Sequence, residues 1–185
     1  VSPDYAGHTK FADNWLPARA GTDGALAMAM GHVILKEFHV DRQPEHFRDY
    51  VKQFTDLPHL VTLEPSGDGS RYRTGKFLTA ADLDGPLAAS EHAAFRTVVI
   101  DEATGAPTCP NGSLADRFGP EGQGRWNLDL GDTVPALSLQ PTAEDAVLVE
   151  FPRFDEGDPT VEARGVPVRR VGDQLVTTVF DLLLA

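Results

Sequence analysis

Cysteine is almost absent from this chain: Cys109 is the single one in 185 residues. One thiol excludes an internal disulfide, a four-cysteine zinc site and an iron–sulfur cluster held by this chain alone. Cys109 lies in the proline- and glycine-rich segment GAPTCPNGS, with no basic residue beside it in the sequence to depress its pKa. We therefore interpret it as a loop thiol and not as a catalytic nucleophile.

Basic residues are also scarce. The chain has 16 Lys and Arg against 28 Asp and Glu, which gives a formal net charge of -12. Such a surface repels phosphate backbones, because nucleic-acid binding needs clustered Lys and Arg, and we exclude nucleic acid as a partner. No apolar run approaches the ~20 residues that cross a bilayer. No basic and then apolar leader opens the chain either, so we expect a soluble polypeptide.

Complete catalytic motifs are missing as well. The sequence has no G-x-S-x-G elbow, no P-loop lysine motif and no G-x-G-x-x-G fingerprint. His32 and His39 are two helical turns apart, but no carboxylate or third histidine stands at the spacing of a metal-binding helix. Surface or core histidines are the better interpretation, and a small hydrolase using Asp and His side chains remains a weak alternative.

The first part of the chain has a helical pattern. Apolar residues recur at helical spacing from Thr22 to Phe38, and a shorter amphipathic stretch begins at Pro44 and ends near Thr55. Thr22 is a plausible N-cap whose hydroxyl accepts from an amide of the first turn, and Asp23 suits the positive end of the helix dipole.

From Val61 onward short β-branched and aromatic runs alternate with turn residues, which predicts a β-rich lobe with long loops. Residues 169–171 and 175–177 flank a GDQ turn, and residues 98–100 lead into a DEATG turn, so both segments predict hairpins. The acidic segment 154–165 is predicted to be mobile. The strand-like segments are RYRTGKFLTAADL, FRTVVIDEATG, RWNLDL, ALSLQ, AVLVEF, VPVRRV and LVTTVFDLLL.

The junction Gly21-Thr22-Asp23 has two interpretations. A threonine and an aspartate that open a helix most often cap it. Alternatively, the two oxygens of Asp23 could accept from N1–H and the exocyclic amine of a guanine base, an edge that few other side chains match. Residues at 2–4 look like those that follow a buried strand, and ligands in α/β sheets bind where strands turn toward helices.

The chain resembles a known family over nearly its whole length. The segments FADNWLPARAGTDGALAMAMGHVILKEFHVD and FRDYVKQFTDLPHLVTLE are similar to catalytic alpha subunits of membrane-bound respiratory nitrate reductases, in the molybdopterin oxidoreductase superfamily. The similarity continues through GKFLTAADL, FRTVVIDEATG, PNGSLADRFG, RWNLDL, VPVRRV and LVTTVFDLLLA. Subunits of this family are several times longer, so the resemblance implies an internal fragment, which agrees with the abrupt apolar end.

The resemblance implies an α/β fold, a cofactor-binding segment of a molybdopterin oxidoreductase with an appended β-rich lobe. Residues 1–64 would belong to the domain that binds molybdopterin guanine dinucleotide, and residues 65–185 would form the lobe. Asp23 would contact the guanine, Gly21 would permit close backbone approach, and the residues at 2–4 would line the ribose and base pocket. The cofactor-binding positions implied in this way are Ser2, Pro3, Asp4, Asp13, Trp15, Pro17, Gly21, Thr22 and Asp23.

The same resemblance implies that the chemistry lies elsewhere. No position of this chain matches the family's aspartate ligand of molybdenum or the ligands of its iron–sulfur cluster, so we expect no catalytic residue and no activity from the fragment alone. The parent enzyme would reduce nitrate to nitrite with bis-molybdopterin guanine dinucleotide. It would work with a beta iron–sulfur subunit and a gamma haem b subunit at the cytoplasmic side of the plasma membrane. The isolated fragment could self-associate, and a stand-alone binding or assembly module without catalysis is the alternative.

Overall fold

The computed structural model places most of the chain, in two compact units that are described separately below. We call Val1–Pro44 unit 1 and Glu45–Ala185 unit 2. Helices and strands are both present, so mixed α and β content is confirmed, whereas the assignment of residues 1–64 to a cofactor-binding domain stays a prediction. The structure describes residues 1–5, 7–40, 42, 44–110, 129–140, 145–153 and 160–185.

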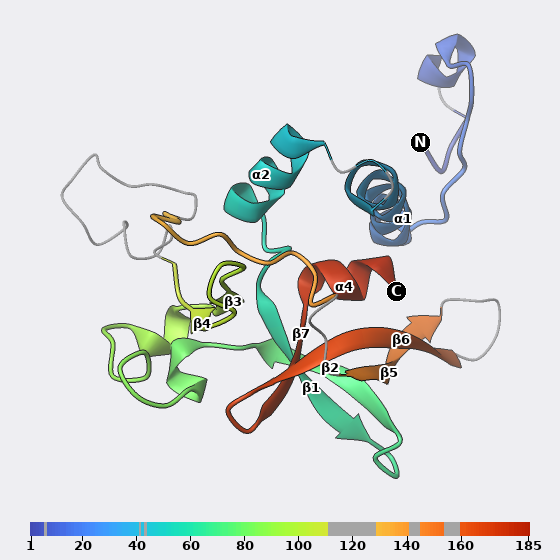
Figure 1. Cartoon of the computed structure of the whole chain (residues 1–185). Helices are drawn as coiled ribbons and strands as arrows, with labels where there is room; N and C mark the ends of the chain where they lie inside the picture. Colours follow the sequence, from blue (N-terminus) through green and yellow to red (C-terminus); the bar gives the residue numbers. More distant parts are fainter. Residues whose placement is uncertain (6, 41, 43, 111–128, 141–144, 154–159) are drawn as a thin grey trace. The chain divides into compact units, whose positions relative to one another are not determined.

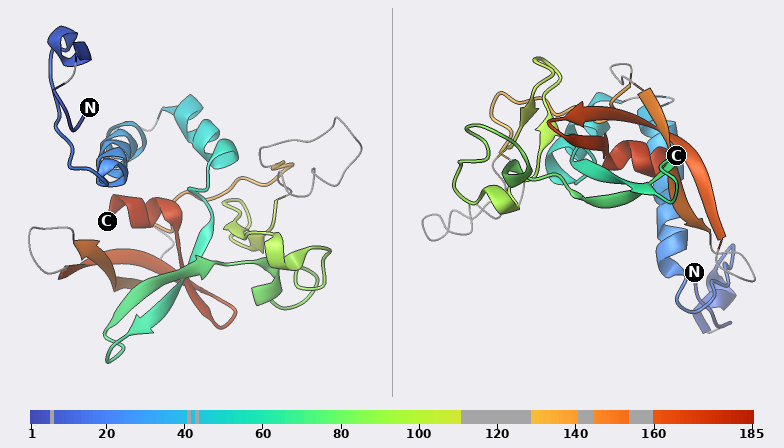
Figure 2. Two further views of the ribbon diagram at one scale, coloured as in Figure 1. Left: turned by 180° about the vertical axis from the view of Figure 1, so that it is seen from behind. Right: turned by 90° about the horizontal axis from the view of Figure 1, so that it is seen from below.

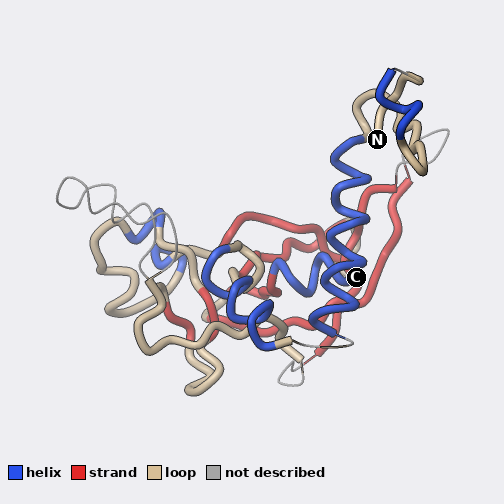
Figure 3. Tube along the Cα trace, turned by 90° about the horizontal axis from the view of Figure 1, so that it is seen from above, coloured by secondary structure: helices blue, strands red, loops and turns tan. Residues whose placement is uncertain are grey.

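Unit 1 is built around the helix α1, Asp23–Leu35 (Figures 1 and 3). A short 3-10 helix, η1 (Gly7–Phe11), precedes it, and one π-helical segment, η2 (Lys36–Val40), continues it. The predicted helix between Thr22 and Phe38 is therefore confirmed, with a change of helical winding after Leu35. The stretch between Asp23 and Lys36 carries no Asp, Glu, Lys or Arg, and His32 is its one polar side chain.

Unit 2 begins with the helix α2, Glu45–Phe54, which confirms the second predicted helix. Val51 is buried, while the rings of Tyr50 and Phe54 stack on the surface with centroids 4.9 Å apart. The Thr55 hydroxyl donates to the Val51 carbonyl at 2.5 Å. The last carbonyls of a helix have no partner within the helix, and the Thr55 hydroxyl bonds to one of them. The helix ends at Phe54, close to the predicted end near Thr55.

Five strands of unit 2 form a closed barrel in the order β1-β2-β5-β6-β7 (Figures 1 and 2). The neighbours are antiparallel except β2 and β5, which meet at the single parallel pair Tyr72↔Val149. The ring of strands closes at this one pair, so β2 and β5 are the most weakly joined neighbours of the barrel. The strands are β1 (Leu60–Ser66), β2 (Arg71–Phe77), β5 (Asp145–Arg153), β6 (Thr160–Val171) and β7 (Gln174–Thr178).

Both predicted hairpins are confirmed. β6 and β7 pair up to Val171↔Gln174, which leaves a two-residue loop at Gly172 and Asp173. Gly172 has φ +58°, in the left-handed region, while Asp173 does not, and this pattern is that of a type II′ turn. The second hairpin joins the short strands β3 (Val99–Ile100) and β4 (Pro107–Thr108). Two 3-10 turns, η3 (Ala80–Asp82) and η4 (Ala93–Phe95), lie between the barrel strand β2 and this hairpin.

Among the described residues of unit 2, buried side chains form two clusters. One joins β1 and β7 to the hairpin segment, with Leu60, Val98 and Val176 fully buried. The other fills the barrel between β1, β5 and β6. Its buried members are Leu63, Val149, Val166 and Val168.

Three of the strand and loop predictions are wrong. The apolar run LVTTVFDLLL is a strand only to Thr178, after which α4 (Val179–Leu184) begins and packs against β6 and β7 (Figure 2). Thr178 accepts from the Asp181 amide, an N-cap that the sequence signature T-x-x-D announces. The segment ALSLQ, 136–140, is irregular although largely buried, and residues 160–165 of the segment predicted to be mobile belong to β6. Most of RWNLDL lies outside the described residues.

Asp181 ties α4 to a distant loop. Its carboxylate accepts from the Ser138 hydroxyl at 2.6 Å, from the Leu139 amide at 2.9 Å and from the Thr178 hydroxyl at 2.9 Å. The residue is 5% exposed, and burial raises the pKa of its carboxyl even though these hydrogen bonds lower it. This carboxylate holds the irregular segment at Ser138 and Leu139, and the Ala136 amide joins the same segment to β3 by donating to the Ile100 carbonyl at 2.7 Å.

Candidate functional site

The loop of unit 1 that precedes α1 folds back on the start of the chain. The Trp15 indole Nε1 donates to the Ser2 carbonyl at 2.8 Å, and the Ser2 amide donates to the Leu16 carbonyl at 3.2 Å. The rings of Tyr5 and Trp15 meet edge to face, with centroids 5.2 Å apart. The structure therefore brings together two groups of predicted cofactor-binding residues that are more than a dozen positions apart in the sequence.

The first group makes a tight local turn around Pro3. The Ser2 hydroxyl donates to the Asp4 carbonyl at 2.9 Å, and the Asp4 amide donates back to Ser2 Oγ at 3.3 Å. Serine side chains stabilise turns in this way without help from the rest of the fold. The Asp4 carboxylate is exposed, so the turn presents it at the surface of unit 1.

The predicted role of Thr22 as a side-chain cap is wrong. Its hydroxyl donates to the Arg19 carbonyl at 2.8 Å, and its amide donates to the same carbonyl at 3.0 Å. Thr22 occupies the N-cap position, but its side chain makes no bond to the first turn of α1. The hydroxyl closes the loop at Arg19 instead, so it does not accept from the amides at the start of the 13-residue helix.

Gly21 is required by the backbone at this junction. Its φ is +84°, a conformation that L side chains rarely adopt, and a Cβ placed there would meet no heavy atom within 4 Å. The glycine is therefore needed for its conformation, and the space beside it is open.

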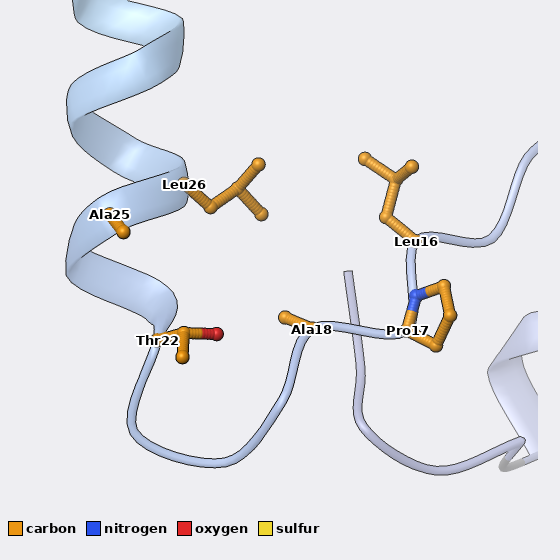
Figure 4. Close-up of a pocket in the computed structure, with 6 residues that line it drawn as sticks. All are labelled: Leu16, Pro17, Ala18, Thr22, Ala25 and Leu26. Atoms are coloured by element: carbon orange, nitrogen blue, oxygen red, sulfur yellow. The ribbon is translucent and has the colours of Figure 1, made fainter. Parts of the chain in front are cut away.

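A pocket of about 320 Å³ lies between this loop and the first turns of α1 (Figure 4). The side chains of Leu16 and Leu26 face each other across it. Two of the predicted residues, Pro17 and Thr22, belong to its lining. The full lining is Leu16, Pro17, Ala18, Thr22, Ala25 and Leu26.

The four apolar members of this lining were missed from the sequence. Their side chains have no polar group, and each fits equally well as part of a helix face or of a loop contact. These residues are Leu16, Ala18, Ala25 and Leu26. Their position in the sequence could have indicated them, because they lie on both sides of the Gly21-Thr22-Asp23 turn. When the chain reverses at this turn, the residues before it come to face the first turns of the helix.

The predicted carboxylates of Asp13 and Asp23 are not among the residues that line the pocket. Asp23 follows the lining residue Thr22 directly and is exposed, and Asp13 is exposed in the loop. The structure thus places an exposed carboxylate next to an apolar pocket at a helix start. The contact of Asp23 with a guanine base stays a prediction.

The histidines and the cysteine offer no second site. No group of three or more His, Cys, Asp or Glu side chains that could hold a metal occurs among the residues that the structure describes. His59 is 7% exposed, and burial lowers the pKa of its imidazole although Asp56 raises it. Within the described ranges, no helix is long and apolar enough to cross a membrane.

Cys109 lies in a loop, directly after β4, as the sequence predicted, but its side chain is buried in the core. It is buried in the cluster that contains Leu60 and Val98, and burial raises the pKa of its thiol. A basic residue does lie near it in space, because Arg96 donates to the Cys109 carbonyl at 2.6 Å. The sequence neighbourhood did not reveal this arginine. The desolvated thiol is a poor nucleophile, as the sequence had indicated on other grounds.

Comparisons with known proteins identify long relatives. No protein-family model matches the chain. It is 54% identical over 192 residues to the nitrate reductase alpha subunit of Mycobacterium tuberculosis and 41% identical over 206 residues to the respiratory nitrate reductase 1 alpha chain of Escherichia coli. Both alignments take in the whole of this chain. A third relative, perchlorate reductase subunit alpha of Dechloromonas aromatica, is 32% identical over 151 residues, or 74% of this chain.

The chain spans only a small part of these relatives. It covers 15% of the M. tuberculosis protein, 16% of the E. coli protein and 14% of the D. aromatica protein. The resemblance to nitrate reductase alpha subunits is confirmed, and the small share of their length fits an internal segment.

Proposed function

We propose that this chain is a segment of the alpha chain of a molybdenum-dependent nitrate reductase, and that unit 1 contributes to binding molybdopterin guanine dinucleotide. The observation that carries the proposal is the 54% identity to the M. tuberculosis nitrate reductase alpha subunit along the whole chain. Identity at this level makes a shared role of the matching segment the simplest interpretation.

The geometry of unit 1 fits part of such a dinucleotide. The apolar walls of the pocket at Leu16 and Leu26 suit a planar base. The uncapped amides of α1 are donors of the kind that bind phosphate oxygens at helix starts. The exposed Asp23 carboxylate can accept two hydrogen bonds from a guanine edge. Ser2, Asp4 and Trp15 would hold the turn that lies beside the base.

The roles proposed here concern binding. The cofactor supplies molybdenum for oxygen-atom and electron transfer when it is bound in the complete enzyme. This segment would position the nucleotide end of the cofactor, and none of its residues is assigned to the chemical step. We further propose that the complete enzyme works with a beta iron–sulfur subunit and a gamma haem b subunit at the cytoplasmic face of the membrane. The name of the E. coli relative, a respiratory nitrate reductase, supports this setting.

A stand-alone binding or assembly module is the second candidate. The closed barrel and the two buried clusters of unit 2 favour it, because they give this unit an interior of its own. Such a module would keep the fold of unit 2 without contributing to catalysis. The two candidates differ in what they require of unit 1.

Nucleotide titration tests the first candidate. We expect the chain to bind GDP weakly, and we expect Asp23→Ala to weaken that binding by about tenfold or more, because hydrogen bonds to a charged group are lost. Calorimetry with GDP and ADP measures the affinities, and circular dichroism checks that α1 persists. Asp84→Ala, which removes an exposed aspartate of unit 2, is the matched control. Equal affinities of wild type and Asp23→Ala would remove Asp23 from base recognition.

A further inference from the structure

The strands of the barrel are joined unevenly. β5 pairs with β6 along its whole length, and β2 pairs with β1 from one end to the other with one irregular step. β2 and β5 meet at the one pair Tyr72↔Val149. A parallel pair is slightly less stable per residue than an antiparallel one, and a single pair supplies few hydrogen bonds. We call this junction between β2 and β5 the seam.

One carboxylate oxygen bridges the seam. Glu150 Oε2 on β5 accepts from Arg73 Nε on β2 at 2.8 Å and from Ser66 Oγ on β1 at 3.0 Å. The Glu150 side chain is 11% exposed and that of Arg73 is 68% exposed, while Ser66 is buried. The hydrogen bond from Arg73, followed by that from Ser66, lowers the pKa of the Glu150 carboxyl, so this group is ionised at neutral pH. Hydrogen bonds to an ionised acceptor are stronger than those between neutral groups.

Few other side chains hold β2 at the seam. Every residue of this strand is exposed except Tyr72, which is partly buried against the inner cluster. Val149, the residue that pairs with Tyr72 across the seam, is fully buried in that cluster. Burial of the strand therefore adds little to the single backbone pair and to the bonds of Glu150.

The other end of the β1–β2 hairpin is fixed. Leu78, directly after β2, is fully buried, and its amide donates to the Leu60 carbonyl at 2.8 Å. The start of β1 also pairs with β7, at Leu60↔Thr178. Figure 1 shows β1 and β2 as one hairpin. This hairpin is thus anchored where it leaves the core, and beyond the anchor it is tied to β5 at the seam.

We propose that the barrel opens between β2 and β5, and that Glu150 is the latch that holds this seam closed. The β1–β2 hairpin moves as the flap, with its hinge next to Leu60 and Leu78. Opening brings Val149 and the inner cluster into contact with solvent while the other buried cluster stays closed. The seam lies wholly within unit 2, so its opening does not depend on the proposed role of unit 1.

Thiol labelling measures this opening. Val149→Cys places a thiol at the buried seam position, and the native Cys109, buried in the other cluster, is a reference in the same molecule. When the seam recloses faster than the reagent reacts, the labelling rate follows the population of the open form. We expect Glu150→Ala to speed labelling of Val149→Cys by about tenfold, because both bonds of the latch are lost. Labelling of Cys109 should stay unchanged.

Two further variants sharpen the test. Glu162→Ala is the matched control, because its ion pair with Arg164 at 2.7 Å lies within β6 and does not cross the seam. It should leave both labelling rates unchanged. Arg73→Gln removes the exposed partner of Glu150 and does not disturb the core, so it tests the latch even where Glu150→Ala fails to fold. We expect it to speed labelling of Val149→Cys by about threefold and to spare Cys109.

Urea distinguishes opening of the seam from unfolding of the whole unit. A local opening exposes little surface, so labelling of Val149→Cys should hardly change at low urea, whereas labelling of Cys109 should rise steeply. The proposal is overturned when Glu150→Ala or Arg73→Gln accelerates both thiols equally, or when both thiols show the same dependence on urea. A rate at Val149→Cys that neither variant changes would overturn it as well.

Discussion

Unit 1 and unit 2 differ in how much of their apolar surface they bury. In unit 2 two clusters of side chains are removed from solvent, and the barrel closes around one of them. In unit 1 Leu35 is the one apolar side chain that is buried among the residues described there. Removing a large apolar side chain from water stabilises a fold by about 1.5–3 kcal/mol, so unit 2 has a source of stability that unit 1 lacks.

The difference shows that a compact unit does not necessarily bury the apolar side chains that it contains. Both units contain an apolar helix, α1 in unit 1 and α4 in unit 2. The strands β1, β5, β6 and β7 contribute buried side chains to the two clusters, whereas β2 is almost entirely exposed. In unit 1, α1 presents exposed apolar side chains that unit 1 itself does not cover. An apolar segment in the sequence therefore need not be buried within its own unit.

The largest expected effect comes from truncation in the core of unit 2. Leu60 is fully buried, so Leu60→Ala should cost about 2–5 kcal/mol through lost burial and the cavity that remains. The matched change in unit 1, Val33→Ala at a half-exposed position, should stay within about 0.5 kcal/mol. Urea unfolding followed by far-ultraviolet circular dichroism measures both. Similar losses for the two variants would break the comparison between the units.

A smaller effect is expected at the carboxylate that joins α4 to its loop. Asp181→Ala leaves the Ser138 hydroxyl, the Leu139 amide and the Thr178 hydroxyl without their acceptor and removes the partner of an N-cap. We expect a loss of about 2–3 kcal/mol in the free energy of unfolding. Asp84→Ala, at an exposed aspartate of the same unit, should be nearly neutral in the same urea titration. Equal midpoints of the two variants would show that the buried carboxylate contributes nothing net.

The smallest effect concerns the pH dependence of unit 2. Burial holds the pKa of His59 below its ordinary value of 6.5, so the unfolded chain binds more protons than the folded one between 6.5 and that lowered value. Stability should therefore fall as the pH drops below 6.5, with a slope of at most about 1.4 kcal/mol per pH unit. His59→Gln should flatten this slope in urea titrations across the window, and His46→Gln, at an exposed histidine of α2, should keep it.

The pH profile also separates two buried groups of unit 2. Burial raises the pKa of Asp181, so the folded state holds this proton more tightly than the unfolded chain, and the contribution of Asp181 to stability rises as the pH falls toward its ordinary pKa of 3.8. The two groups therefore change the stability in opposite directions as the pH falls. A single monotonic loss of stability down to pH 4 that His59→Gln does not change would contradict the assignment to His59.

Much of the local structure was predictable because the signals are local. Helical periodicity from Thr22 and proline at the start of the second helix gave the correct helices. The GDQ turn gave the correct hairpin, although its loop is one residue shorter because Gln174 belongs to β7. The closed barrel was not predicted, because its closing pairs join Leu60 with Thr178 and no local pattern records such a distant register. The strand-to-helix change at Thr178 was missed because an apolar run of that length fits both structures, and the capping pair Thr178 and Asp181 was not considered.

The structure brings some of the predicted site residues close together, but their role in binding a cofactor stays a prediction. The sequence grouped Ser2 with Trp15 and placed Pro17 and Thr22 at a loop-to-helix turn, and the hydrogen bond and the pocket bring these residues together in pairs. The role of the Thr22 hydroxyl was wrong, because its carbonyl partner at Arg19 is three residues away and competes with capping. Apolar wall residues such as Leu26 have no chemical signature that distinguishes a pocket from a helix face.

The pairing of β1 with β7 also sets an order of events during synthesis. β1 is the first strand of unit 2 to leave the ribosome and β7 is the last, so the ring of strands is completed only when the C-terminal part has emerged. Until then β1 has one exposed edge, and α1 has been outside the exit tunnel for longer still with its apolar side chains in water. A chaperone that shields nascent apolar segments would therefore meet α1 first and the β1 edge second.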